Sequence, residues 1–115
     1  MEAMHEAKTY WANIYVGTKE GYDGSVSPIS DVIKMVREYT DKVGLGVTIT
    51  PTYFAYTGGD EPGAIVGLIN YPRFPSTNEQ IKSHALSLAA ILKEQLKQQR
   101  VSIVFPDKTI IIGEK

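Results

Sequence analysis

The segment from residue 70 to residue 77 carries the side chains best suited to bind a small anionic ligand. It reads Asn-Tyr-Pro-Arg-Phe-Pro-Ser-Thr, so two prolines stiffen the backbone around Arg73 and Phe74. An arginine can fork two hydrogen bonds to a phosphate, and an aromatic ring can stack on a base. The segment leads into a predicted helix whose free N–H groups and dipole attract anions. The predicted ligand-binding residues here are Asn70, Arg73, Phe74, Ser76 and Thr77.

A simpler interpretation of this segment stays open: Phe74 would close the core and Arg73 would be solvated. A second basic cluster contains Lys93, Lys97 and Arg100, next to Gln98 and Gln99. Cations at a helix C-terminus often only stabilise the helix. We nevertheless add Lys97 and Arg100 to the predicted ligand-binding set. The expected topology places this cluster at the opposite end of the sheet, so the two clusters would meet only across a subunit boundary.

The chain shows no pattern that would assign it a reaction. The two histidines are His5, near the N-terminus, and His84, on a predicted helix where a structural role is the common one. Asp60 and Glu61 lie in a glycine-rich hairpin, where acidic residues are usual turn formers. Neither a nucleophile motif nor a metal-ligand spacing is present. We therefore predict a protein that is not an enzyme and has no catalytic residues, metal or cofactor. The opposing hypothesis is a small enzyme, such as a phosphodiesterase or an isomerase. The missing acid–base pair argues against it.

Composition narrows the class of partner. The chain has 115 residues, 43% of them hydrophobic, with no cysteine and a net charge of −1. It lacks the basic excess of proteins that grip long nucleic acids, and no apolar run approaches the ~18 residues of a membrane span. We expect a cytoplasmic protein with a small nucleotide-like ligand, no long nucleic acid and no membrane partner. Residues 1–7 are predicted to form a disordered arm before one domain at residues 8–115.

Hydrophobic periodicity predicts an α+β fold. Glycine-marked residues 17–26 form a predicted loop, Gly44 a helix end, and residues 57–63 a hairpin connection. Pro51 points to an edge strand or a bulge. The predicted elements are a strand at 8–16, a helix at 28–42 with Ser27 as its N-cap, strands at 45–56 and 64–71, a helix capped by Ser76 or Thr77 with Gln80 completing a capping box, and strands at 100–105 and 109–112.

The resulting order, β-α-β-β-α-β-β, is the ferredoxin-like pattern with one added strand. It predicts an antiparallel sheet with both helices on one face. The other face would carry alternating side chains of the first strand, such as Trp11 and Tyr15, and of the second, such as Thr50 and Phe54. Such a half-polar face is available for a ligand or for oligomerisation. It could equally be an ordinary exposed face.

Three segments resemble a known family. They are Asn13-Ile14-Tyr15-Val16-Gly17, Val43-Gly44-Leu45-Gly46-Val47-Thr48-Ile49-Thr50-Pro51-Thr52 and Gly67-Leu68-Ile69-Asn70-Tyr71-Pro72-Arg73-Phe74-Pro75-Ser76. Across residues 8–112 the chain is similar to the first-described class of phage anti-Thoeris sponge proteins. It also resembles, more weakly, uncharacterised bacterial proteins with the same order of strands and helices.

The sponge resemblance implies non-enzymatic sequestration of a nucleotide-derived immune signal. The ligand would be a cyclic ADP-ribose isomer, with cyclic oligonucleotides at a separate site, and the host an infected or lysogenic bacterium. A symmetric homo-oligomer is implied, from a dimer up to a hexamer. The loop with Arg73 and Phe74, together with Arg100, has the residue types that such ligands need. The alternative is an interaction module that oligomerises through its open sheet face and binds no small ligand.

Overall fold

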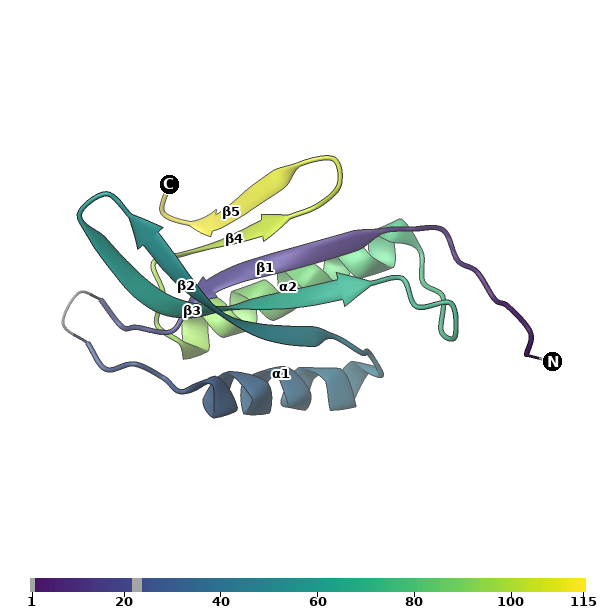
Figure 1. The fold of residues 1–115 in the computed structure, drawn as a ribbon, viewed down its shortest axis with the longest axis horizontal. Helices are drawn as coiled ribbons and strands as arrows, with labels where there is room; N and C mark the ends of the chain where they lie inside the picture. Colours follow the sequence, from purple (N-terminus) through teal and green to yellow (C-terminus); the bar gives the residue numbers. More distant parts are fainter. Residues whose placement is uncertain (1, 22–23) are drawn as a thin grey trace.

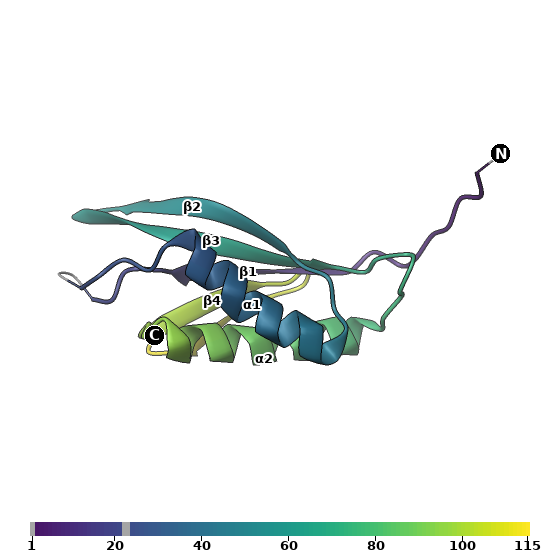
Figure 2. The same cartoon turned by 90° about the horizontal axis from the view of Figure 1, so that it is seen from below.

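In the part of the chain that the structure describes, five antiparallel strands and two helices make up the fold (Figure 1). The computed structural model describes residues 2–21 and 24–115. The elements are β1 (Trp11–Gly17), α1 (Ile29–Val43), β2 (Thr48–Tyr56), β3 (Gly59–Ile69), α2 (Asn78–Gln95), β4 (Arg100–Val104) and β5 (Thr109–Gly113). The sheet order is β2-β3-β1-β4-β5, and both helices lie on one side of it (Figure 2). The predicted α+β, ferredoxin-like architecture is confirmed.

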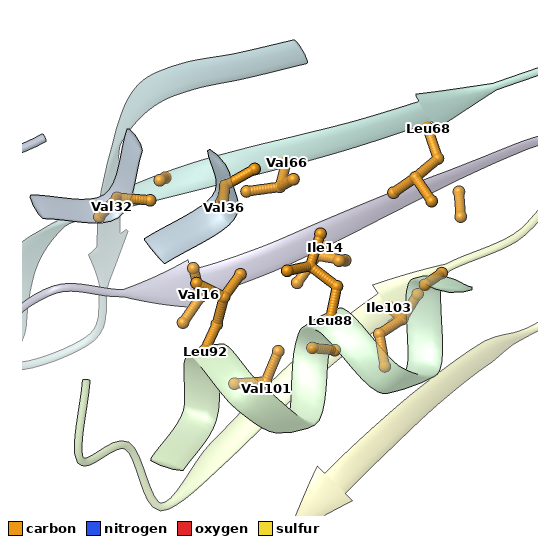
Figure 3. Packing of buried hydrophobic residues seen from close by; sticks show 14 of the residues in the cluster. Ile14, Val16, Val32, Val36, Val66, Leu68, Leu88, Leu92, Val101 and Ile103 are labelled. Atoms are coloured by element: carbon orange, nitrogen blue, oxygen red, sulfur yellow. The ribbon is translucent and has the colours of Figure 1, made fainter. Parts of the chain in front are cut away.

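Alternation along the central strand β1 separates the core from the open face. Ala12, Ile14 and Val16 are fully buried toward the helices, whereas the residues between them are only half-buried. Side chains alternate between the faces of a strand, so one face of β1 enters the core and the other does not. Buried residues of the sheet and of both helices form one hydrophobic core (Figure 3). The core residues labelled in the figure are Ile14, Val16, Val32, Val36, Val66, Leu68, Leu88, Leu92, Val101 and Ile103.

Helix ends follow local sequence signals, with one difference from expectation. Gly44 adopts the left-handed conformation at φ 72° and ends α1, and Thr77 begins α2 with the predicted capping box to Gln80. At the start of α1 the structure differs from the prediction. Pro28, not Ser27, is the N-cap, and its side chain makes no capping hydrogen bond. Proline has no N–H to satisfy, which lowers the need for a cap.

The β2–β3 hairpin is longer than predicted. Its turn is only Thr57–Gly58, and Gly58 takes a positive φ of 89°. Pairing therefore begins at once, between Tyr56 and Gly59, and extends along both strands. A two-residue turn with glycine matches the natural twist of a hairpin, so the predicted connection at residues 57–63 is mostly strand. β2 is an edge strand, as Pro51 indicated.

Two predictions concern residues beyond these elements. Residues 2–10 belong to no helix or strand, while Met1 of the predicted arm lies outside the described residues. The division into an arm at 1–7 and a domain at 8–115 stays a prediction. Tyr22 and Asp23 of the predicted loop at 17–26 also lie outside the described residues. In the described part of the chain, no helix is long and apolar enough to cross a bilayer.

Leu88 gives a direct test of the core. Its side chain on α2 is fully buried within the cluster, so Leu88→Ala should lower the free energy of unfolding by about 2–5 kcal/mol. The matched control is Ile33→Ala on α1, where the side chain is 43% exposed. Urea denaturation of both variants measures the difference. Equal losses at the two positions would contradict the assigned core.

Candidate functional site

A hollow in the described part of the molecule lies on the open face of the sheet, at the end where β1 stops and β4 begins. Its volume is about 650 Å³. The lining residues are Tyr15, Gly17, Lys19, Glu20, Gly21, Phe54, Tyr56, Glu61, Lys97, Gln98, Gln99, Arg100 and Ser102. They come from four adjacent strands and from the two connections that follow β1 and α2. The strands provide the floor of this pocket, and the connections provide one wall.

Two glycines on neighbouring strands leave space for other side chains at the floor of the pocket. Gly17 on β1 pairs with Gly63 on β3. A Cβ at Gly63 would stand 2.2 Å from the Phe54 ring, so that ring lies directly over the glycine backbone. A Cβ at Gly17 would stand 2.6 Å from Glu61 Oε1 and 2.7 Å from Gln98 Oε1. The absence of side chains at these two positions is what lets the other groups reach inward.

Glu61 lies on strand β3, although the sequence predicts a turn at this position. It pairs with Phe54 across the hairpin and is half-buried. The expectation of ordinary turn chemistry for Asp60 and Glu61 is therefore wrong for Glu61, because the turn ends before them at Gly58. Among residues 2–21 and 24–115, Glu61 forms no ion pair. It presents an uncompensated carboxylate to the pocket.

The wall of the pocket is held by contacts between the connections. Gln98 Nε2 donates hydrogen bonds to the carbonyl oxygens of Lys19 at 2.9 Å and Leu96 at 3.0 Å. Lys97 has a positive φ of 55° and places its Nζ 3.8 Å from Glu20 Oε1. Both charges are largely exposed, and such a pair contributes about 0–1 kcal/mol. The glutamine, whose donors meet backbone carbonyls, is the firmer of the two links.

Arg100 supplies the pocket with positive charge. It begins β4 on the same face as Ser102, and the sheet register places it across β1 from the Glu61 side. No carboxylate of the described residues lies within ion-pair distance of Arg100. The pocket therefore has an unpaired cation at one side and an unpaired carboxylate at the other. Such a site suits a ligand that carries both signs of charge beside an apolar or aromatic group.

The other predicted ligand residues lie at the far end of the sheet, on the loop between β3 and α2 (Figure 1). Asn70 is engaged internally, because its Oδ1 accepts from Ser76 N and its Nδ2 donates to Lys8 O, both at 2.8 Å. Thr77 N donates to Gln80 Oε1. The structure thus brings Lys97 and Arg100 together but separates them from Asn70, Arg73, Phe74, Ser76 and Thr77.

Arg73 and Phe74 lie against each other on the loop between β3 and α2. The guanidinium carbon lies 5.3 Å from the ring centroid, and the Phe74 side chain is 71% exposed. A small hollow beside them is lined by His5, Pro72 and Arg73. The alternative in which Phe74 closes the core is excluded by this exposure. Ligand binding at this loop stays a prediction.

His84 has a structural partner away from the pocket. Its Nδ1 lies 2.8 Å from the Tyr39 hydroxyl at the contact between α1 and α2. Burial raises the pKa of Tyr39 above its ordinary value, outweighing the hydrogen bond from Ser87 that lowers it. Which of the two groups donates in this hydrogen bond depends on the tautomer of the His84 ring. Within the described residues, no three His, Asp or Glu side chains come together as a metal site would need.

Comparison with known proteins gives matches of structure only. No protein-family model matches the chain, and no curated protein matches its sequence. One solved structure, a phage SAM lyase in complex with S-methyl-5'-thioadenosine, matches with a TM-score of 0.83 and 18% identity over 99% of this chain and 96% of that one. A phage SAM lyase in the apo state matches with a TM-score of 0.74 and 20% identity over 92% and 90%. Both neighbours are SAM lyases.

These matches overturn two predictions made from the sequence. The neighbours with this fold are enzymes, which contradicts the prediction that the protein is not one. The sequestering role, whether for a cyclic ADP-ribose isomer or for cyclic oligonucleotides, is contradicted for the same reason, since the neighbours act on S-adenosylmethionine. The resemblance of the three segments to anti-Thoeris sponges stays a prediction, but the function drawn from it does not stand.

Gly17 tests the geometry of the pocket. In Gly17→Ala the new methyl group should push aside the far ends of Glu61 and Gln98, and each hydrogen bond that Gln98 then loses to the Lys19 and Leu96 carbonyls should cost about 0.5–1.5 kcal/mol. The NMR signals of the Gln98 side-chain amide should shift. Gly44→Ala is the control: it should cost about 1 kcal/mol by straining a left-handed residue and leave those signals in place. Unchanged Gln98 signals in Gly17→Ala would contradict the convergence of groups over Gly17.

Proposed function

We propose that this protein is a SAM lyase that binds S-adenosylmethionine in the pocket on the open face and releases S-methyl-5'-thioadenosine. The observation that carries the proposal is the match over 99% of the chain to a phage SAM lyase bound to that product. The pocket agrees in chemical character. S-adenosylmethionine has an aromatic base, a carboxylate and two positive groups, and the pocket offers aromatic rings, Arg100 and Glu61.

The identity of the product defines the bond that breaks. The sulfonium sulfur carries a methyl group, the adenosyl carbon and the Cγ of the amino-acid chain. The product keeps the first two, so the S–Cγ bond breaks and its electron pair neutralises the sulfur. The four-carbon fragment can then complete its valence by losing a proton from Cβ or by bonding Cγ to its own carboxylate. Neither route incorporates water, as the term lyase requires.

Positions around the pocket suggest how the substrate lies. Phe54 and Tyr56 on β2, with Tyr15 on β1, offer rings against which the adenine can stack, each worth about 1–3 kcal/mol. Arg100 would bind the substrate carboxylate by a forked pair of hydrogen bonds. Glu61 would meet the positive end of the amino acid. This arrangement stretches the substrate across β3, β1 and β4, with the S–Cγ bond near Gly17.

We also propose a homo-oligomer, a dimer or larger, that covers the open face. The S–Cγ cleavage removes charge from sulfur, and reactions that neutralise charge are favoured where water is excluded. A single chain leaves Tyr56, Ile69 and Ile111 about half exposed on this face. A second copy packed on this face would exclude water from the pocket. Since S-adenosylmethionine is an intracellular metabolite, the proposed place of action is the cytoplasm of a bacterial host.

Activity gives the first test. Purified protein mixed with S-adenosylmethionine should release S-methyl-5'-thioadenosine over many turnovers, as followed by chromatography. Glu61→Gln should reduce kcat/KM by about 10- to 100-fold, because a hydrogen bond to a charged group is replaced by a neutral one. Glu79→Gln on the exposed start of α2 should leave activity unchanged. No product from the parent protein, with the substrate intact after prolonged incubation, would refute the proposed function.

The oligomer has its own test. Light scattering should give a mass at least twice the 12.7 kDa of one chain. Ile111→Lys, which places a charge on the open face, should lower both the mass and the activity. A monomer with full activity would contradict the oligomer but not the lyase.

A further inference from the structure

We infer that Gln98 and Glu61 together bind the α-ammonium group of the substrate, and that Gln98 thereby distinguishes substrate from product. This inference rests on the proposed function. Gln98 lines the pocket from the turn between α2 and β4, and Glu61 reaches it from β3. The two come from segments far apart in the sequence and meet over β1.

The two side chains present oxygen atoms to one spot. Glu61 Oε1 and Gln98 Oε1 both lie within 3 Å of the point where a Cβ of Gly17 would stand. Among the described residues, neither oxygen accepts a hydrogen bond from another side chain. Two acceptors that converge without a donor between them favour a ligand that brings the donors.

Backbone contacts fix the direction of the Gln98 amide. Its Nε2 donates to both Lys19 O and Leu96 O, so both amide hydrogens are used. Turning the amide over would place its oxygen against two carbonyl oxygens, which is unfavourable. The Oε1 atom is therefore held toward Gly17 as an acceptor. Gln98 acts as a ligand whose orientation is set before the substrate arrives.

The chemistry of the substrate decides which positive group fits this pair. An ammonium has three N–H donors, and a carboxylate together with an amide oxygen can accept two of them. The sulfonium has no such donor. Its charge also disappears as the S–Cγ bond breaks, so a carboxylate against sulfur would stabilise the substrate more than the transition state and slow the reaction. The ammonium keeps its charge throughout the reaction, so binding it does not raise the activation free energy of the cleavage.

The same pair would help the product to leave. S-methyl-5'-thioadenosine has neither an ammonium nor a carboxylate, so it makes no use of Gln98, Glu61 or Arg100. Its affinity would depend on the aromatic contacts alone. The site thus binds the amino-acid end of the substrate strongly and the thioadenosine product weakly, which favours turnover.

A thermodynamic cycle with a modified ligand tests the role of Gln98. The ligands are an unreactive analogue of S-adenosylmethionine, in which carbon replaces sulfur, and the same compound without its α-amino group. Calorimetry should show that the parent protein binds the amino compound about 10- to 100-fold more tightly. In Gln98→Met this ratio should fall several-fold, while the affinity for S-methyl-5'-thioadenosine stays the same. Gln95→Met, an exposed residue at the end of α2, is the matched control.

A second variant separates binding from structure. Gln98→Lys retains donors for the Lys19 and Leu96 carbonyls but removes the acceptor, so it should keep the thermal stability of the parent and lose the preference for the amino compound. An unchanged preference in both variants would overturn the inference. If S-adenosylmethionine is cleaved while Gln98 has no effect on the preference, this inference fails alone. If it is neither bound nor cleaved by the parent protein, the proposed function fails with it.

Discussion

The packing of both helices against a single face of the sheet, with α2 lying against β1, is the constraint on which the rest of the molecule depends. Ile14 and Val16 are fully buried under the helices, and because side chains alternate along a strand, their neighbours must face the opposite way. Tyr15 and Gly17 are thereby committed to the open face together with their partners on β3 and β4. The pocket is a consequence of how the core is closed. A shift of β1 by one residue in register would turn its core side chains to the open face and its open-face side chains into the core.

The sequence predicted the fold well because the signals for it are local. The stripe of α2, the capping box at Thr77 and the glycine at the end of α1 act within one or two helical turns. The errors are also physical. Ser27 precedes a helix that begins only at Ile29, so it does not cap it, and the glycines and acids of residues 57–63 are typical of a turn although most of that segment is strand. Glycine in a strand also marks a close approach of other groups, as it does at Gly63.

The residues of the pocket were harder to predict from the sequence than the fold. Lys97 and Arg100 were identified, but Glu61 and Gln98 gain their roles only from the register of three strands and from a turn that follows a distant helix. No spacing within one segment contains that information. The prediction of no enzyme failed for a chemical reason: it required a paired acid and base. A sulfonium already carries its leaving group as a neutral thioether, so the proposed reaction needs no proton delivered to that group. It depends on orientation and exclusion of water.

The claim that the open-face pocket receives the nucleoside can be tested residue by residue. Isotope-labelled protein would be titrated with S-methyl-5'-thioadenosine while backbone amide signals are followed by NMR. The account predicts that the largest changes fall on β1, β3 and β4 around the pocket, at Tyr15, Gly17, Glu61 and Ser102. Changes confined to residues 70–77, or none at a large excess of ligand, would contradict it.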